Sequence, residues 1–436
     1  MSTPFELSRR HFMSHMAAAS AMTVPVATSF TNIMRANAKE LQKKHKACIL
    51  MFMEGGPPTI DFWDPKPGTA TGGPFKEIET SAPGVKLGEH MPLLAKQMHH
   101  AAVIRSMSTR EADHNRGKYY MHTGYVPNPS VEHPSYGAVI AHELQNPEVD
   151  IPPFVAIGTN SYGPGFLGMS YAPFVVDSNG QVRNLDMKME PARLAQRLQM
   201  LGQLENNFAA SGRGEPPAEH KKVIDRTVSL MTSDQMKAFK IDDEPDSIKE
   251  LYGVTVPGGT APAAGMMRRN TTFGRSALVA RRLVERGVPF VEISMGGWDL
   301  HANTHDTLKN SNLPVMDMAM AGLIQDLNDR GMLEDTAIVW MGDFGRTPRI
   351  NARAGRDHWA RSWSTFVAGG GMKGGQAVGA TNEDGTAVAT DPIKSEDLMA
   401  SVLKGLGVSL ETTFTSKNNR PMKIANSGKY IKELFS

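Results

Sequence analysis

The segment that most constrains the fold is a short apolar run followed at once by a carboxylate. Residues 336–358 have the sequence TAIVWMGDFGRTPRINARAGRDH. The run at 337–341 is rich in β-branched and aromatic residues, a pattern typical of a strand buried on both faces of a parallel sheet. The run stops at Gly342, so Asp343 stands where the chain leaves the sheet. Because ligands of open α/β sheets collect outside the carboxyl ends of the strands, this segment predicts an α/β fold with a polar site at Asp343.

Other parts of the chain repeat the alternation of buried strand and helix. Apolar runs of strand length occur at 47–53, 101–107, 153–157, 289–294 and 364–368. Segments with a helical pattern lie at 134–144, 275–286, 313–330 and 395–406. This alternation predicts right-handed crossovers within a mostly parallel sheet. Residues from about 185 to 265 differ, because charged helical segments lead there into a Pro/Gly/Ala loop, and we interpret them as a helical insertion covering the sheet.

The N-terminus has the three parts of a twin-arginine export signal. Residues 8–13 are SRRHFM, residues 16–30 are weakly apolar, and residues 36–38 are Ala-Asn-Ala, a candidate cleavage site. The alternative is a surface Arg pair before an ordinary helix. The apolar stretch is too short and too polar to remain as a membrane span. We therefore expect residues 1–38 to be removed and residues 39–436 to form one exported domain, in the periplasm or secreted.

Charge and cysteine content exclude several classes of function. Loss of residues 1–38 removes three Arg and one Glu, which leaves equal numbers of basic and acidic residues. Bulk charge therefore gives no attraction to nucleic acid. The single cysteine, Cys48, excludes an internal disulfide and a thiolate zinc site. A redox protein is disfavoured too, because the sequence has no Cys pair, haem motif or dinucleotide glycine pattern.

Acidic and imidazole side chains follow several of the predicted strands. Glu54, Asp299 and Asp343 each stand at a strand exit, and His301 and His358 lie close to them in the sequence. Exits of parallel strands meet along one edge of a sheet, so we expect these five residues to share a site. Carboxylate and imidazole together suit Zn²⁺ or Mn²⁺, with Ca²⁺ and Mg²⁺ as alternatives. The ordinary interpretation of each residue alone is a turn carboxylate or a hydrogen-bonded core histidine.

Two further residues are candidates for binding an oxyanion. Arg346 follows Asp343 within one loop turn and has the planar fork that binds oxyanions bidentately. His114, Lys118 and His122 recur at helical spacing and are predicted to share one helix face. The alternative is that these histidines only cap or hydrogen-bond a surface helix. The residues predicted to lie behind the site or at the surface are His305, Asp306 and Asp357.

Five segments resemble a bacterial family called domain of unknown function 1501. They are MEGGPPTIDFWDPK at 53–66, ADHNRGKYYMHTGY at 112–125, GGWDLHAN at 296–303, VWMGDFGRTPRIN at 339–351 and GRDHW at 355–359. The resemblance runs over nearly the whole chain. The family is similar to the alkaline phosphatase and sulfatase superfamily, which implies a three-layer α/β/α sandwich with a divalent-metal site at the strand exits.

The resemblance implies metal-ligand roles for some of these residues. Glu54 stands where the superfamily usually has Asp at the first strand exit. Asp299 and His301 resemble its Asp-and-His pair at a shorter spacing, and His358 resembles its late His. Asp343 resembles the Asp of its Asp-His pair.

The chain also departs from the superfamily pattern. Phe344 follows Asp343 where a His is expected. No Cys-x-Pro-x-Arg sulfatase motif is present. Thr59 is the hydroxyl nearest to Glu54 in the sequence and is the candidate nucleophile, with Ser108 and Thr109 as rivals.

These observations lead to two hypotheses of function. The first is an exported metal-dependent hydrolase of phosphate or sulfate esters, acting on a small-molecule or saccharide ester. Thr59, His114 and Arg346 would take part in catalysis, and a divalent ion would be bound. The second is a non-catalytic, envelope-associated binding protein that keeps the fold without a nucleophile, which Phe344 favours.

Overall fold

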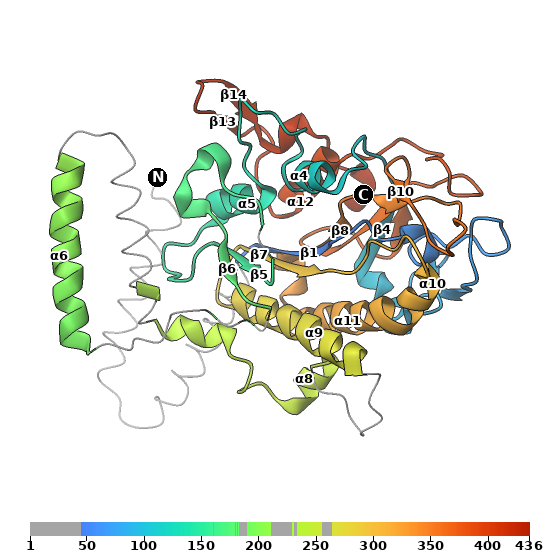
Figure 1. The fold of residues 1–436 in the computed structure, drawn as a ribbon, viewed down its shortest axis with the longest axis horizontal. Coiled ribbons are helices and arrows are strands. Elements are labelled where there is room, and N and C mark those ends of the chain that lie inside the picture. Colours follow the sequence, from blue (N-terminus) through green and yellow to red (C-terminus); the bar gives the residue numbers. More distant parts are fainter. Residues whose placement is uncertain are drawn as a thin grey trace, which may run out of the picture. The chain divides into compact units, whose positions relative to one another are not determined.

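A central sheet of eight strands organises the chain (Figure 1). The computed structural model describes residues 45–159, 161–178, 180, 182, 190–210, 229–230, 233–254 and 264–436. The predicted export signal and much of the predicted insertion lie outside these residues. From Lys46 onward the chain forms one compact unit.

The strand order is β12-β4-β11-β8-β1-β7-β5-β6. The strands are β1 (Ala47–Met53), β4 (Ala101–Met107), β5 (Phe154–Ile157), β6 (Phe174–Val176), β7 (Phe290–Met295), β8 (Thr336–Gly342), β11 (Trp363–Gly369) and β12 (Gln376–Val378). All neighbours are parallel except the two pairs that β11 makes. The mostly parallel sheet predicted from the sequence is therefore confirmed, with β11 as the strand that runs the other way.

Helices cover both faces of the sheet. The helices are α3 (Pro92–Ala95), α4 (His114–Thr123), α5 (Tyr136–Leu144), α6 (Pro191–Ala210), α8 (Asp246–Leu251), α9 (Ala264–Glu285), α10 (Thr304–Thr307), α11 (Leu313–Asp329) and α12 (Ser395–Gly405). Figure 1 shows α9 and α11 on one side of the strands and α4, α5 and α12 on the other. This arrangement confirms the predicted three-layer α/β/α sandwich.

The two core layers follow from the alternation of side chains along the strands. Ile49 and Met51 of β1 pack into the cluster that includes α9 and α11, whereas Leu50 and Phe52 pack into the cluster that includes α5 and α12. Every residue of β1 is buried, as the continuous apolar run predicts for a strand covered on both faces. Cys48 lies in the second cluster and is buried, as expected.

Smaller elements complete the fold around the sheet. Two-stranded ribbons form from β2 (Glu77–Glu79) and β3 (Lys86–Gly88), β9 (Gly345–Arg346) and β10 (His358–Trp359), and β13 (Thr413–Thr415) and β14 (Pro421–Lys423). A 3₁₀ turn, η1 (Thr59–Asp61), follows β1, and a π-turn, η6 (Leu308–Asn312), joins α10 to α11.

Buried ion pairs tie residues 243–244 to the helices under the sheet. Arg281 of α9 is 1 % exposed at its side chain and lies 2.8 Å from both Glu244 and Asp326, and 2.7 Å from Glu285. Three carboxylates therefore surround one buried guanidinium, which joins α9 to α11 and to the segment before α8.

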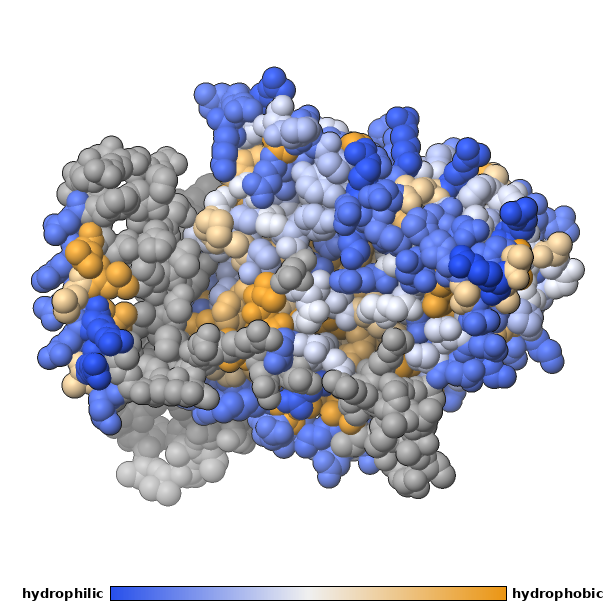
Figure 2. All heavy atoms as spheres, viewed as in Figure 1, coloured by the Kyte–Doolittle hydropathy of each residue, from blue (hydrophilic) through white to orange (hydrophobic). Residues whose placement is uncertain are grey.

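The described surface is largely polar on the face shown in Figure 2. Among the described residues, no helix combines the length and apolar character needed to cross a membrane.

Candidate metal centre

The candidate centre lies where β8, β1 and β7 end side by side. In the sheet, Met53 pairs with both Gly342 of β8 and Met295 of β7, so the three strands leave the sheet at one level. The loop after β7 folds back onto the end of β1, since Trp298 N donates to Glu54 O at 3.2 Å. Gly55 has φ +113°, and a Cβ there would lie 2.6 Å from Asp299 N. This glycine therefore allows the close approach that brings Asp299 to the edge.

Three imidazole rings meet the carboxylate of Asp299 at this edge. The Nε2 atoms of His114, His301 and His358 lie 3.3, 3.0 and 3.4 Å from Asp299 Oδ1. His301 Nε2 also lies 3.2 Å from His358 Nε2. Donor atoms of His114, Asp299 and His358 all fall within 4.8 Å of one another. We call these four residues the His–Asp cluster.

Each of the three imidazole rings of the His–Asp cluster has a hydrogen-bond partner at Nδ1. His114 Nδ1 lies 2.5 Å from Asp343 Oδ2, and His301 Nδ1 lies 2.9 Å from Asp357 Oδ1. His358 Nδ1 lies 2.8 Å from the carbonyl oxygen of residue 112. Oxygens of carboxylates and carbonyls only accept, so each Nδ1 donates its proton to that partner, and Nε2 is the ring nitrogen that faces Asp299.

The three Nε2 atoms and Asp299 Oδ1 are of the kind that binds a metal cation. Three imidazole nitrogens and a carboxylate oxygen converge there, and His114 Nε2 is buried with no hydrogen bond to any described residue. Imidazole and carboxylate ligands hold Zn²⁺ at about 2.0–2.2 Å. In a tetrahedral site this places ligand atoms roughly 3.3–3.5 Å apart, close to the separations of His114 and His358 from Asp299.

Charges around the cluster shift the pKa values of its members. Partial burial raises the pKa of Asp299, but the hydrogen bond and charge of Arg346 outweigh it and hold that pKa well below its usual range. The hydrogen bond that His114 donates to Asp343 raises the pKa of His114 above its usual value. Asp299 is therefore ionised at neutral pH, and protons compete with a metal ion for His114.

Arg346 is fully buried and its five N–H groups are all engaged. It donates from Nε to Gly56 O at 2.7 Å and from Nη2 to Gly55 O and Asp299 Oδ1. Its Nη1 lies 3.1 Å from Arg356 O and 3.2 Å from His301 Nε2. Arg346 thus anchors Asp299, and one N–H points at the position where the imidazoles converge. Its predicted part in oxyanion binding stays a prediction.

Asp343 and Glu54 stand beside the cluster rather than in it. Asp343 has no exposed surface and its Oδ2 contacts His114, while Gly117 lets α4 pack closely against it, since a Cβ there would lie 3.1 Å from Asp343 O. Glu54 accepts from Thr159 at 3.2 Å and lies 3.4 Å from Lys118 Nζ. Their roles as metal ligands, predicted from the sequence, remain predictions.

The candidate hydroxyls lie in different surroundings. Thr59 is 2 % exposed, and its Oγ1 accepts from the backbone N–H of Ser364 at 3.0 Å. Ser108 and Thr109 line a separate pocket. No contact of these hydroxyls with the His–Asp cluster is among the hydrogen bonds of the described residues, and the nucleophile predicted at Thr59 stays a prediction.

A buried ion pair holds the loops around the centre. Arg356 and Asp61 have no exposed side-chain surface and lie 2.6 Å apart, and His305 Nε2 lies 3.0 Å from the same carboxylate. Arg356 N also donates to Leu300 O at 3.0 Å, next to His301. His305 and Asp61 therefore serve as supports for the loops that carry the cluster.

The face predicted for His114, Lys118 and His122 exists on α4. His114 reaches the His–Asp cluster, Lys118 reaches Glu54, and His122 lies 3.1 Å from the buried Glu292 of β7. The helical spacing indicated the shared face. His114 lies at the centre, and its predicted part in oxyanion binding stays a prediction.

Comparison with known proteins gives a family match and distant structural similarities. A family model described as "Protein of unknown function (DUF1501)" matches residues 45–435. A search of curated protein sequences gave no match. Among solved structures, the PsFucS1 sulfatase from Pseudoalteromonas sp. is 13% identical with a TM-score of 0.38, and the match covers 89% of this chain and 72% of that one.

Two further solved structures are similarly distant. The phosphonate monoester hydrolase SpPMH from Silicibacter pomeroyi is 12% identical with a TM-score of 0.36, covering 89% of this chain and 76% of that one. The alkaline phosphatase from the Antarctic bacterium TAB5 is 13% identical with a TM-score of 0.31, covering 83% of this chain and 98% of that one.

Proposed function

The chain belongs to the DUF1501 family, and from that premise we propose that it is an exported, metal-dependent hydrolase of phosphate or sulfate esters. The observation that supports this most is the meeting of three imidazole Nε2 atoms on Asp299 Oδ1. Sites that hold a catalytic ion offer such convergent, preoriented acceptors beside a strand edge.

We propose that His114, Asp299 and His358 hold the ion and that His301 completes the set. Three imidazole nitrogens suit Zn²⁺ or a related transition metal better than Ca²⁺ or Mg²⁺, since those ions prefer oxygen ligands. When bound, such an ion would polarise a phosphoryl or sulfuryl oxygen of the ester.

The surrounding residues prepare this site. Asp343 and Asp357 hold the protons of His114 and His301 on Nδ1, so that Nε2 stays available. Arg346 keeps Asp299 ionised and directs one N–H toward the same point. To contact an ester oxyanion on the substrate, that N–H would exchange its contact with His301 Nε2 for one with the oxyanion.

Elemental analysis and turnover assays test the proposal together. Purified protein should contain a divalent metal near one equivalent and should hydrolyse an aryl phosphate or aryl sulfate. Asp299→Asn and His358→Gln should lose both properties. His142→Gln is the matched control, because His142 lies on α5 and pairs with its neighbour Glu143. A metal-free wild type without turnover after supply of Zn²⁺ or Mn²⁺ would reject the proposal.

A binding protein without catalysis is the second candidate, favoured by Phe344. Its ring lies 4.9 Å from the ring of His114 and 4.8 Å from that of His358. An aromatic ring therefore stands against the centre where the family resemblance predicts a further ligand. This candidate predicts metal binding that Thr59→Ala leaves intact and no hydrolysis with any metal supplied.

The export step is proposed from residues 8–13 and 36–38. Replacement of Arg9 and Arg10 by Lys should keep the protein in the cytoplasm, as seen by fractionation of the producing cells. Export of the double variant at the wild-type level would reject the twin-arginine route.

A further inference from the structure

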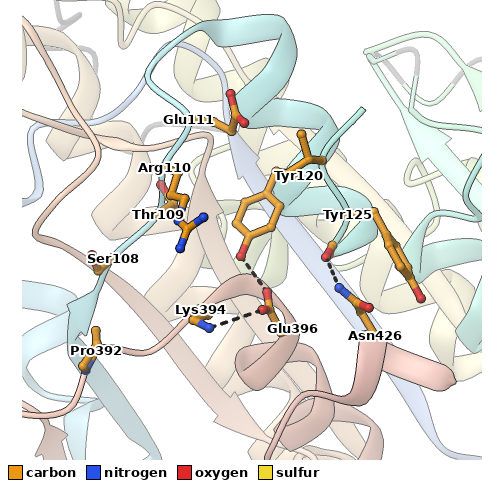
Figure 3. Close-up of a pocket in the computed structure, with 12 residues that line it drawn as sticks. Ser108, Thr109, Arg110, Glu111, Tyr120, Tyr125, Pro392, Lys394, Glu396 and Asn426 are labelled. Carbon is orange, nitrogen blue, oxygen red and sulfur yellow. Dashed lines mark hydrogen bonds and ion pairs between the residues drawn. The ribbon is translucent and has the colours of Figure 1, made fainter. Parts of the chain in front are cut away.

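A cavity lies between the exit of β4, helix α4 and the start of α12 (Figure 3). Its volume is about 370 Å³, at the small end of the range of roughly 300–1,000 Å³ typical of ligand pockets. We call it the β4–α12 pocket. Its lining residues from the β4 exit are Ser108, Thr109, Arg110 and Glu111.

Among the charged residues that line the β4–α12 pocket, Arg110 is the one without an ion pair to a described residue. Glu111 is held by Arg116 through two hydrogen bonds of 2.6 and 2.9 Å. Glu396 accepts from Tyr120 at 2.6 Å and has Lys394 at 4.0 Å. Arg110 makes no ion pair or hydrogen bond to any residue that the structure describes. A ligand entering the pocket therefore meets a free guanidinium, which favours an anionic group.

A buried hydroxyl on the same wall also lacks a partner. Thr109 is only 8 % exposed, and its Oγ1 makes no hydrogen bond within the described parts of the chain. Figure 3 shows Thr109 and Arg110 on one side of the pocket, across from Tyr120. Buried polar groups are normally paired, so an unpaired hydroxyl next to a cavity indicates that a ligand or water supplies the partner.

The opposite wall is aromatic and rigid. Tyr120 is fixed through its hydroxyl on Glu396, and the ring of Tyr125 stacks on His133 with centroids 4.0 Å apart and an angle of 7°. Aromatic rings with polar edges suit a ligand that presents C–H groups on its faces and hydroxyls around its rim. A pyranose ring has this character, and the cation opposite suits a carboxylate or sulfate on it.

The residues that line the pocket lie directly before His114 of the His–Asp cluster in the sequence. Residues 108–111 line the pocket, the carbonyl of residue 112 accepts from His358, and Asp113 caps α4 at the turn that carries His114. His114 and Tyr120 are six residues apart on α4, about 9 Å along the helix axis. The pocket and the His–Asp cluster therefore lie at neighbouring positions along α4.

We propose that the β4–α12 pocket is a subsite for an anionic sugar unit, carrying a carboxylate or a sulfate, that adjoins the ester at the His–Asp cluster. Arg110 binds the anionic group, and Tyr120 and Tyr125 pack against the ring. This assignment rests on the proposed hydrolase function, but binding to the pocket needs no turnover.

Titration calorimetry on the full chain tests the subsite with three probes: trigalacturonate, galactose 6-sulfate and neutral galactose. We expect the two anionic probes to bind and galactose to bind at least tenfold more weakly. Arg110→Gln should weaken the anionic probes by about tenfold, the loss expected for one charge-assisted hydrogen bond. Arg197→Gln is the matched control, since Arg197 is exposed on α6 and outside the pocket.

Each result decides the assignment. Binding of an anionic probe that is lost in Arg110→Gln and kept in Arg197→Gln supports it. Equal binding of galactose, equal binding by the Arg110 variant, or no binding of either anionic probe would overturn it. Absence of metal or turnover, with Arg110-dependent binding intact, would instead reject the hydrolase function and leave a sugar-binding pocket.

Discussion

Replacing Asp343 by Asn separates an orienting role from direct metal ligation. In the structure Asp343 is fully buried and contacts only the Nδ1 side of His114, at 2.5 Å. Asn keeps the size and an accepting oxygen but removes the charge. The variant should therefore keep the hydrogen bond at His114 Nδ1. It should lose the negative charge that makes His114 Nε2 a strong metal ligand.

The size of the effect follows from this position. Removing a partner behind a metal-binding imidazole typically costs about 10- to 100-fold in metal affinity, or roughly 1.4–2.8 kcal/mol. We expect Asp343→Asn to fall in that range. Asp357→Asn should cost less, because the side chain of Asp357 is 50% exposed and water can replace it as the partner of His301.

Competition with a chromophoric zinc chelator measures these affinities directly. Asp299→Asn provides the reference for loss of a ligand and should abolish binding at the same chelator concentration. If Asp343→Asn binds metal as poorly as Asp299→Asn, then Asp343 is itself a ligand and the orienting role is wrong. An affinity equal to that of the wild type would show that His114 needs no support from Asp343.

Three other substitutions test the remaining parts of the structure. Burial raises the pKa of Asp317 to about 6, so the folded state holds a proton there more tightly than the unfolded state. Its contribution to stability is therefore present at low pH and is lost as pH rises from about 4 to about 6, by roughly 3 kcal/mol. Asp317→Asn should lack this slope in urea unfolding measured across that range, and an unchanged slope would contradict the assignment. Arg281→Ala removes one cation from Glu244, Asp326 and Glu285, which keep Arg282 and Arg330 as partners, and should cost about 1–3 kcal/mol in unfolding free energy, whereas an unchanged unfolding free energy would show that the contacts of Arg281 are dispensable. Thr59→Val removes the acceptor for Ser364 N–H and should cost about 1–3 kcal/mol with turnover per folded molecule retained. Complete loss of turnover with metal still bound would instead make Thr59 the nucleophile.

Most of the sheet could be predicted from the sequence because its strands are buried on both faces. The run at 47–53 became β1 with the same bounds, and that at 101–107 became β4. Such runs show the burial of the strand in their composition, since most of their residues are apolar. The direction of β11 could not be predicted in the same way, because parallel and antiparallel pairing present the same buried side chains.

One helix end shows the limit of local patterns. Ser is a common N-cap residue, but α12 begins at Ser395 itself and Lys394 stands at the N-cap. The Ser395 hydroxyl donates to Tyr120 O at 3.1 Å instead. A contact with α4, distant in the sequence, decided where this hydroxyl points.

The sequence by itself determined most of the strands, the family, and that Asp299, His301 and His358 lie near strand exits. Only the tertiary structure decided which side chains meet. His114 reaches the centre from α4, after a strand separated from β8 by β11, while Glu54 points to Lys118. The physical reason is that apolar periodicity records which residues are buried, whereas the direction of a polar side chain at a strand exit depends on the loops that pack around it.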